Sequence, residues 1–211
     1  MRKINRIAIM LIAVLMPLLA KADVAADALA EISAAAQQMK SFECNFVQTK
    51  TLKLLGDKMT SKGRLCYRQP DKLRWEYTSP YSYTFIINGG KVQINKGGRN
   101  DVIDADKNKV FKEVARIMLN SVVGKSLTDS REFAATVQST ADIHVVTLLP
   151  QKKDMKHMFS KIVLRYDRRQ KMVVGVEMHE RKGDSTVIDM TNVVKDKTIA
   201  DSVFTVKRTY V

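Results

Sequence analysis

The sequence predicts a mainly β (α+β) protein of ten or eleven antiparallel strands in one twisted sheet, with helices covering one apolar face. Two observations predict this fold class. Most of the chain after residue 40 alternates apolar and polar residues with a period of two, which is typical of half-buried strands. Only residues 24–39 and 109–123 show the spacings of three and four that indicate amphipathic helices. A sheet of this length tends to curl, and helices placed over the concave face would complete its burial.

Residues 1–22 have the pattern of a secretory signal peptide. Three basic residues within positions 2–6 precede an apolar run from Ile7 to Ala20, and Ala20-Lys21-Ala22 fits an A-x-A cleavage site. An apolar run of roughly 14 residues is shorter than the ~20 that a membrane span needs. We therefore expect a cleaved signal peptide over 1–22, a single mature domain over 23–211 and, in a bacterial host, a periplasmic location.

The formal net charge of +14 restricts the classes of partner. A basic surface suits anionic lipid headgroups, nucleic acid or an acidic partner. Export and the lack of an RNA-binding aromatic motif or a Cys/His finger argue against nucleic acid. A solvated basic surface that keeps the protein in solution remains an equally good interpretation.

The first half of the mature chain combines one helix with a series of strands. Residues 24–39 place Leu29, Ile32, Ala36 and Met39 on one helical face. Strand alternation begins at Phe42, breaks at the turn region LLGDKMTSKG, resumes through Leu65 and Tyr67, and turns again at Pro70-Asp71. Leu73, Trp75 and Tyr77 then alternate with charged residues, and YSYTFIINGGKVQINKGG predicts a hairpin that turns at Asn88-Gly89-Gly90.

The second half predicts one more helix and four or more strands. Residues 109–123 place Val110, Val114, Ile117, Met118 and Val122 on one helical face. Strands are expected over about 132–138 and 142–149, followed by a hairpin that turns at 167–170, with Leu164 and Met178 among its inward residues. Lys182-Gly183-Asp184 turns into the strand STVIDMTNVV, and TIADSVFTVK closes the chain.

Cys44 and Cys66 leave two alternatives open. Both lie in strand-like runs that flank the turn near Gly56, so a cross-strand disulfide is possible in an oxidising compartment. Two small buried thiols are the other interpretation. Neither a C-x-x-C pair nor a zinc-type spacing is present.

The sequence carries no familiar catalytic motif. G-x-S-x-G, H-E-x-x-H, G-x-G-x-x-G and P-loop patterns are all missing from it, and its three histidines are far apart in sequence. We therefore expect that the protein is not an enzyme and that it binds neither a metal nor a cofactor. An exported hydrolase with an unfamiliar site is the competing interpretation, and it would need a polar cavity with paired carboxylates or histidine.

The segment GRLCYRQPDKLRWEYTSP, residues 63–80, resembles the LolA family of outer-membrane lipoprotein carriers. The resemblance lies in the order Gly, Leu, basic residue and Pro, followed by Trp five residues after that Pro and a second Pro five residues later. FVQTK is similar to the F-x-Q strand of that family, and IINGGKV is similar to its turn of Asp/Asn-Gly-Lys type. ADSVFTV is similar to its closing strand after a short helical turn.

The resemblance implies an unclosed antiparallel β-barrel of about eleven strands, with a helical lid over an apolar cavity. The cavity would shield the acyl chains of lipoproteins that cross the periplasm. The implied partners are acylated lipoproteins, an inner-membrane lipoprotein-releasing ABC transporter and an outer-membrane lipoprotein acceptor, and we expect a monomer. The alternative is a LolA-like protein that binds or senses another lipid or lipid-like intermediate.

Several residues are candidates for the cavity wall or the lid, and simple core packing is the alternative for each. Gln69 is a departure, because members of the family commonly carry arginine before the first proline. Arg68 should face the other way if alternation holds. The candidates are Phe46, Leu65, Tyr67, Gln69, Leu73, Trp75, Tyr77, Phe85, Val114, Met118, Leu164, Met178 and Met190.

Overall fold

The computed structural model describes residues 25–107, 112, 119 and 131–205. The expected signal peptide and most of the expected second helix, with Val114 and Met118, lie outside these residues. In that helix segment Lys112 and Leu119 are described, and both are helical.

One antiparallel sheet dominates the described residues, with eleven strands in the order β6-β5-β4-β3-β2-β1-β11-β10-β9-β8-β7. Strands that are consecutive in sequence pair with each other, except β6 and β7, and β1 pairs with β11 as well as with β2. The edge strands β6 and β7 do not pair with each other, so the sheet is unclosed. The strands are β1 (Ser41–Leu52), β2 (Asp57–Arg68), β3 (Lys72–Ser79), β4 (Tyr83–Asn88), β5 (Lys91–Lys96), β6 (Arg99–Asp104), β7 (Phe133–Ser139), β8 (Ile143–Pro150), β9 (Phe159–Asp167), β10 (Met172–Glu180) and β11 (Ser185–Lys195).

Short helical elements accompany the sheet. The N-terminal helix spans residues 25–38, and α3 (Lys153–Met158) lies between β8 and β9. Two 3-10 turns, η1 (Ala105–Lys107) and η3 (Asp201–Phe204), follow β6 and β11. The mainly β, unclosed architecture predicted for this chain is therefore confirmed.

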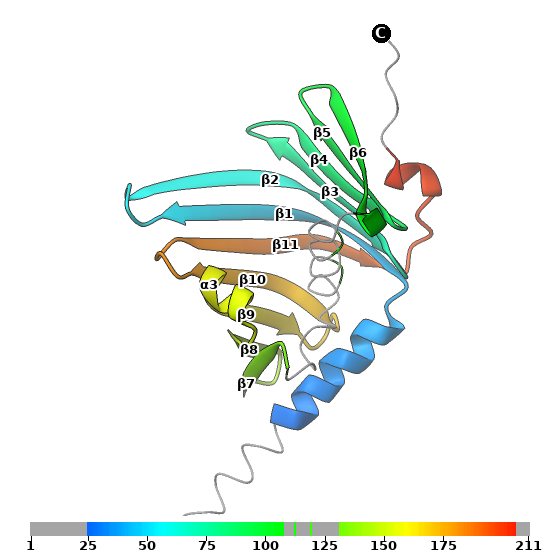
Figure 1. Ribbon diagram of the computed structural model, residues 1–211. Helices are drawn as coiled ribbons and strands as arrows, with labels where there is room; N and C mark the ends of the chain where they lie inside the picture. The colour runs from blue at the N-terminus through cyan, green and yellow to red at the C-terminus, as the bar shows by residue number, and fades with distance from the viewer. Residues whose placement is uncertain (1–24, 108–111, 113–118, 120–130, 206–211) are drawn as a thin grey trace, which may run out of the picture.

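The N-terminal helix packs against the part of the sheet formed by β7 to β10 and leads into the start of β1 (Figure 1). Ala28, Ile32 and Ala36 are buried on it, and Met39 is buried just beyond its end. Their spacing of three and four residues forms the apolar stripe expected from the sequence. Ile32 packs among Val146, Leu164 and other residues of β7 to β10.

Both faces of the sheet bury apolar residues. The face that contacts the N-terminal helix, here called the inner face, carries the largest cluster, which includes Phe42, Leu65 and Leu73. On the outer face Cys66 and Ile86 pack against Ile199 and Phe204 of the C-terminal segment. Cross-strand alternation separates the two sets, since successive side chains point to opposite faces.

The two cysteines lie on opposite faces, and both thiols are free. Cys44 pairs with Leu65 across β1 and β2, whereas Cys66 pairs with Glu43, one position along. Cys44 belongs to the inner-face cluster and Cys66 to the outer one. The structure therefore shows the second alternative, two buried free thiols. Cys66 is one residue beyond the partner of Cys44, and a shift of one residue along a strand turns the side chain to the other face.

Some elements differ from those expected. Residues 99–104, RNDVID, form the edge strand β6 although they are too polar to show an apolar period. Residues 153–158 form the unanticipated helix α3. A register shift between Val173 and Gly175 brings Val173 into the cluster of Leu164 and Tyr166, while its neighbours Met172 and Val174 pack in the inner-face cluster, so strict alternation is interrupted at the start of β10. The helical turn near the C-terminus is present as η3, and the last six residues of the chain lie outside the described ones.

Candidate functional site

Side chains on the inner face form rows that cross the strands from β1 to β5. The row nearest the start of β1, where the N-terminal helix ends, is the most buried, and burial decreases in the rows farther from it. The first row is fully buried and consists of Phe42, Tyr67, Leu73, Ile87 and Val92. The second row is Cys44, Leu65, Trp75, Phe85 and Ile94, in which Trp75 and Ile94 are only partly buried. The third row is Phe46, Gly63, Tyr77 and Tyr83, and both tyrosines are partly buried.

Four aromatic rings form a continuous cluster in the second and third rows. The ring centroid of Phe46 lies 5.3 Å from that of Trp75 and 5.2 Å from that of Tyr77, the latter pair edge to face. The rings of Tyr77 and Tyr83 are 6.0 Å apart. Such pairs are favourable geometries for aromatic rings, and the partly buried ones leave apolar area uncovered.

Gly63 makes room for this cluster. A Cβ atom at this position would lie 2.5 Å from the Phe46 ring and 2.0 Å from the carbonyl oxygen of Glu76. The Phe46 ring therefore occupies the space over β2 that a side chain would fill. This glycine opens the segment 63–80 that carries the family resemblance, but it was not among the candidate residues for the cavity wall.

One polar pair lies within the aromatic cluster. Tyr77 Oη donates a hydrogen bond of 2.9 Å to Gln48 Oε1. Burial raises the pKa of Tyr77, so its hydroxyl is neutral near neutral pH. Uncharged polar groups of this kind satisfy each other without introducing charge into an apolar surface.

The inner face continues across β11 to β7. Phe46 pairs with Met190, and Ile188 pairs with Val176, which in turn pairs with Leu164. Met178 is partly buried next to this row. Methionine adapts its shape readily, which suits a wall that contacts flexible apolar groups.

The structure brings most of the predicted residues into one cluster. Leu164 lies in the neighbouring cluster under the N-terminal helix, and Val176 packs against both clusters. Sequence reasoning missed Tyr83 and Gln48 as site residues, although both lie on the alternating faces it identified. The residues gathered in the one inner-face cluster are Phe46, Leu65, Tyr67, Leu73, Trp75, Tyr77, Phe85, Met178 and Met190.

Gln69 contacts the end of the N-terminal helix. Its side-chain Nε2 donates to the carbonyl oxygens of Gln37 at 3.1 Å and Ala36 at 3.4 Å. These carbonyls belong to the last helical turn, where no helical N–H is available to them. Gln69 therefore links the helix to the turn between β2 and β3.

Arg68 points the other way, as alternation predicts. Its guanidinium binds the Ile199 carbonyl oxygen and the Asp201 carboxylate, and it lies 5.3 Å from the Phe204 ring centroid. Arg68 thus fastens the C-terminal segment to the outer face and does not replace Gln69 at the helix.

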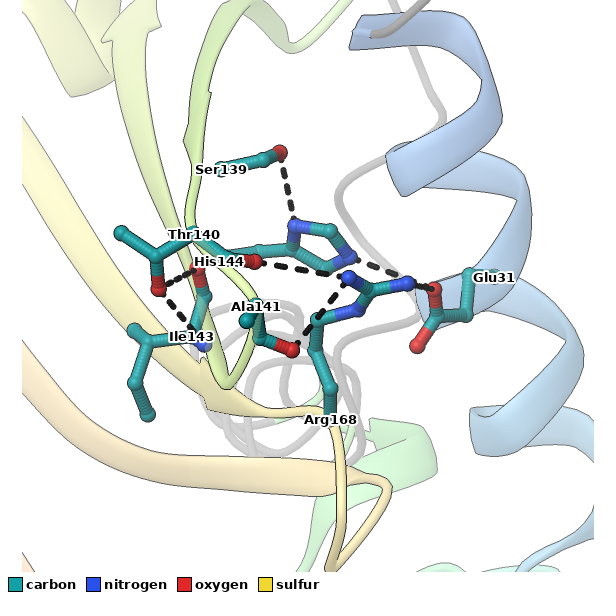
Figure 2. A network of polar contacts seen from close by, with 7 residues as sticks. All are labelled: Glu31, Ser139, Thr140, Ala141, Ile143, His144 and Arg168. Atoms are coloured by element: carbon teal, nitrogen blue, oxygen red, sulfur yellow. Dashed lines mark hydrogen bonds and ion pairs between the residues drawn. The ribbon is translucent and has the colours of Figure 1, made fainter.

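A polar network holds the middle of the N-terminal helix (Figure 2). Glu31 Oε2 lies 3.2 Å from both His144 Nε2 and an Arg168 guanidinium nitrogen. Because a carboxylate only accepts, His144 Nε2 donates, and Nδ1 of a neutral ring then accepts from Ser139 Oγ at 2.8 Å. Burial raises the pKa of Glu31, but hydrogen bonds from His144 and Arg168 and the Arg168 charge lower it more, so the net pKa lies below the ordinary value.

Ionisable groups in the described residues are arranged for structure. Glu76, the carboxylate nearest Trp75 in sequence, forms two hydrogen bonds of 3.0 and 3.1 Å with Arg74, which lower its pKa. Among the described residues no cluster of three His, Cys, Asp or Glu side chains could hold a metal. The same residues contain no helix of the length and apolar character needed to cross a bilayer.

Comparison with known proteins agrees with this arrangement. The sequence model of the family described as "Outer membrane lipoprotein carrier protein LolA" matches residues 37–207. An outer-membrane lipoprotein carrier protein of Chromobacterium violaceum is 26% identical over 168 residues, which is 77% of this chain and 75% of that protein.

Two solved structures have the same fold. A chain of the Pseudomonas aeruginosa MucA/MucB complex superposes with a TM-score of 0.55 at 16% identity, covering 86% of this chain and 60% of that one. An uncharacterized conserved protein of Thermus thermophilus gives a TM-score of 0.55 at 7% identity, with coverage of 85% and 91%. The family match spans most of the sequence and the fold is shared, so the chain belongs to the LolA family of outer-membrane lipoprotein carrier proteins.

Proposed function

We propose that this protein is a periplasmic carrier that binds the acyl chains of lipoproteins against its inner face and moves them from the inner to the outer membrane. The observation that carries the proposal is the aromatic cluster of Phe46, Trp75, Tyr77 and Tyr83 on the inner face of an unclosed sheet, in which both tyrosines and Trp75 are only partly buried. Membership of a family of carriers, not of enzymes, supports it.

The energetics of acyl chains explain why such a protein is needed. Removing one methylene from water contributes about 0.8 kcal/mol, so a chain of ~16 carbons contributes on the order of 10 kcal/mol. A lipoprotein with several chains would not leave a bilayer for water unaided. Partly buried side chains such as Trp75 and Met178 offer apolar area that a chain could cover.

The N-terminal helix is suited to act as part of the lid. It is joined to the sheet by its apolar stripe, by Gln69 at its end and by the Glu31 network at its middle. Displacing it would uncover the clusters around Ile32 and Ala36. Cargo would be received from an inner-membrane lipoprotein-releasing ABC transporter and delivered to an outer-membrane acceptor.

Site-specific photocrosslinking in the native host tests this proposal. A photo-reactive residue in place of Trp75 should crosslink to triacylated lipoproteins. The matched control is the same residue in place of Arg64, which is exposed on β2 one position from Leu65 and on the other face. Equal crosslinking at both positions would contradict a role for the inner face.

A LolA-like binder or sensor of another lipid is the second candidate. Gln69 favours it, because an uncharged amide stands where the resemblance leads one to expect arginine. In the same experiment this candidate predicts adducts of free phospholipid, or of a lipid-like intermediate, at Trp75 and no lipoprotein adduct.

A further inference from the structure

We propose that the turn between β1 and β2 docks the protein on an anionic phospholipid bilayer. This turn carries Leu54 and Leu55, whose side chains are 95% and 72% exposed, and Met59 follows at 52%. Lys53 and Lys58 flank the leucines and are exposed as well. We call these five residues the basic tip. The inference is independent of the proposed cargo.

The basic tip has a defined position at the far end of the sheet. Pairing of β1 with β2 continues to Leu52 and Asp57, so residues 53–56 form a tight turn, and Gly56 has a positive φ of 64°. The backbone N–H of Lys53 donates to Asp184 Oδ1 at 3.0 Å, which joins this turn to the one between β10 and β11. Figure 1 shows both turns at the same end of the molecule.

Further basic residues lie beside the tip. Arg181 in the neighbouring turn donates to the carbonyl oxygens of Met158 and Lys156, at 3.0 and 2.8 Å, and so brings the C-terminal end of α3 to this end of the sheet. Lys156, Arg181 and Lys182 are exposed, and the Met158 side chain is 57% exposed. Exposed apolar and basic side chains therefore occur together on adjacent segments.

The acidic side chains described at this end are engaged locally. Asp57 accepts from the Lys58 backbone N–H, and Asp184 accepts from that of Lys53. Glu180 lies 3.5 Å from Lys50. Lys53 and Lys58 are exposed and form no salt bridge with a described residue. The side chain of Lys53 passes over Gly183 in the neighbouring turn.

These features fit a bilayer surface. Leucine side chains at the point of a turn can enter the boundary between headgroups and acyl chains, while flanking lysines remain at the level of anionic headgroups. Lysines near an anionic leaflet add attraction that salt screens within a Debye length. A projecting turn has little concave surface with which to bind a folded acidic protein.

Flotation with vesicles tests the proposal. The full chain is expressed and the protein is purified from the periplasm. Once the signal peptide has been removed, it cannot contribute to vesicle binding. It should float with vesicles of mixed phosphatidylglycerol and phosphatidylcholine, less at high salt, and not with phosphatidylcholine alone. The double variant L54S/L55S should lower the partition coefficient by about tenfold or more.

Matched variants separate docking from general effects. Val194→Ser changes a side chain that is 47% exposed near the opposite end of β11 and should leave partitioning unchanged. K53E/K58E should abolish the preference for anionic vesicles, with unchanged thermal unfolding. Equal flotation of L54S/L55S and the unchanged protein would overturn the proposal. Failure of the unchanged protein to float would overturn it as well, even if the protein then bound an acidic protein.

Discussion

At the residue scale, Gly63 determines whether the aromatic cluster can form. Replacing it with alanine would place a Cβ atom 2.0 Å from the Glu76 carbonyl oxygen, and backbone of a paired strand cannot move aside easily. We predict that Gly63→Ala lowers the free energy of unfolding by on the order of 1–3 kcal/mol. Chemical denaturation followed by circular dichroism measures the change.

Gly175→Ala is the matched control for this prediction. Gly175 also lies inside a strand, but its added Cβ would meet the end of the Arg165 side chain, which can rotate away. We expect a clearly smaller loss. Equal losses for the two variants would show that the crowding around Phe46 does not decide the effect.

Gln69 is the second residue on which the account depends. Replacing it with leucine removes two hydrogen bonds to the end of the N-terminal helix, which lowers the free energy of unfolding by about 0.5–1.5 kcal/mol. Arginine would keep a donor and add a positive charge near a helix C-terminus, where cations are favourable. Hydrogen exchange over residues 25–38 should therefore be faster in Gln69→Leu and slower in Gln69→Arg.

An arginine variant that exchanges faster than the unchanged protein would contradict this assignment. If the helix is part of the lid, Gln69→Arg should also release bound cargo more slowly. Thr78→Leu, an exposed change on β3, serves as the control that should leave exchange over 25–38 unaltered.

At the element scale, the N-terminal helix should loosen in acid. The pKa of Glu31 is lower in the folded protein than its ordinary value of 4.5, so the stabilisation from Glu31 is complete above that pH and is lost as the pH falls through the folded-state pKa. The carboxylate is partly exposed, so solvent screens the effect. Hydrogen exchange over residues 25–38 measured below and above pH 4.5 should show the loss.

Glu31→Gln should exchange faster than the unchanged protein at neutral pH and lose the acid-dependent change over residues 25–38. If that change persists in Glu31→Gln, another group is responsible. Asp27→Asn alters an exposed carboxylate on the same helix and should keep the dependence.

Helices and strands whose apolar residues recur with a clear period could be predicted from the sequence. Elements that are determined by tertiary contacts could not. The apolar stripe that includes Ile32 and Ala36 identified the N-terminal helix, and alternation identified the inner-face residues from Phe46 to Tyr77. The strand β6 could not be predicted, because its polar residues are held by pairing with β5. The shift at Val173 depends on pairing register, which alternation along one strand does not specify. The opposite faces of the two cysteines follow from alternation, because Cys44 is two residues from Phe46 whereas Cys66 is next to Leu65.

At the scale of the whole molecule, an unclosed sheet with two apolar faces serves two purposes. The outer face is covered by the C-terminal segment through Phe204 and the Arg68 contacts. Among the described residues, the N-terminal helix covers one end of the inner face, Leu119 packs against its largest cluster, and aromatic side chains toward the other end are only partly buried. Binding of apolar chains at these partly buried aromatic side chains is the central claim.

Fluorescence of Trp75, the single tryptophan of the chain, tests that claim most directly. A lipopeptide with brominated acyl chains should quench it saturably, because bromine quenches only at contact distances. A Trp75→Phe protein that carries Arg64→Trp on the outer face should bind the same lipopeptide without quenching. If the lipopeptide binds the unchanged protein and Trp75 emission is unaffected, the acyl chains lie elsewhere and the account of the inner face is wrong.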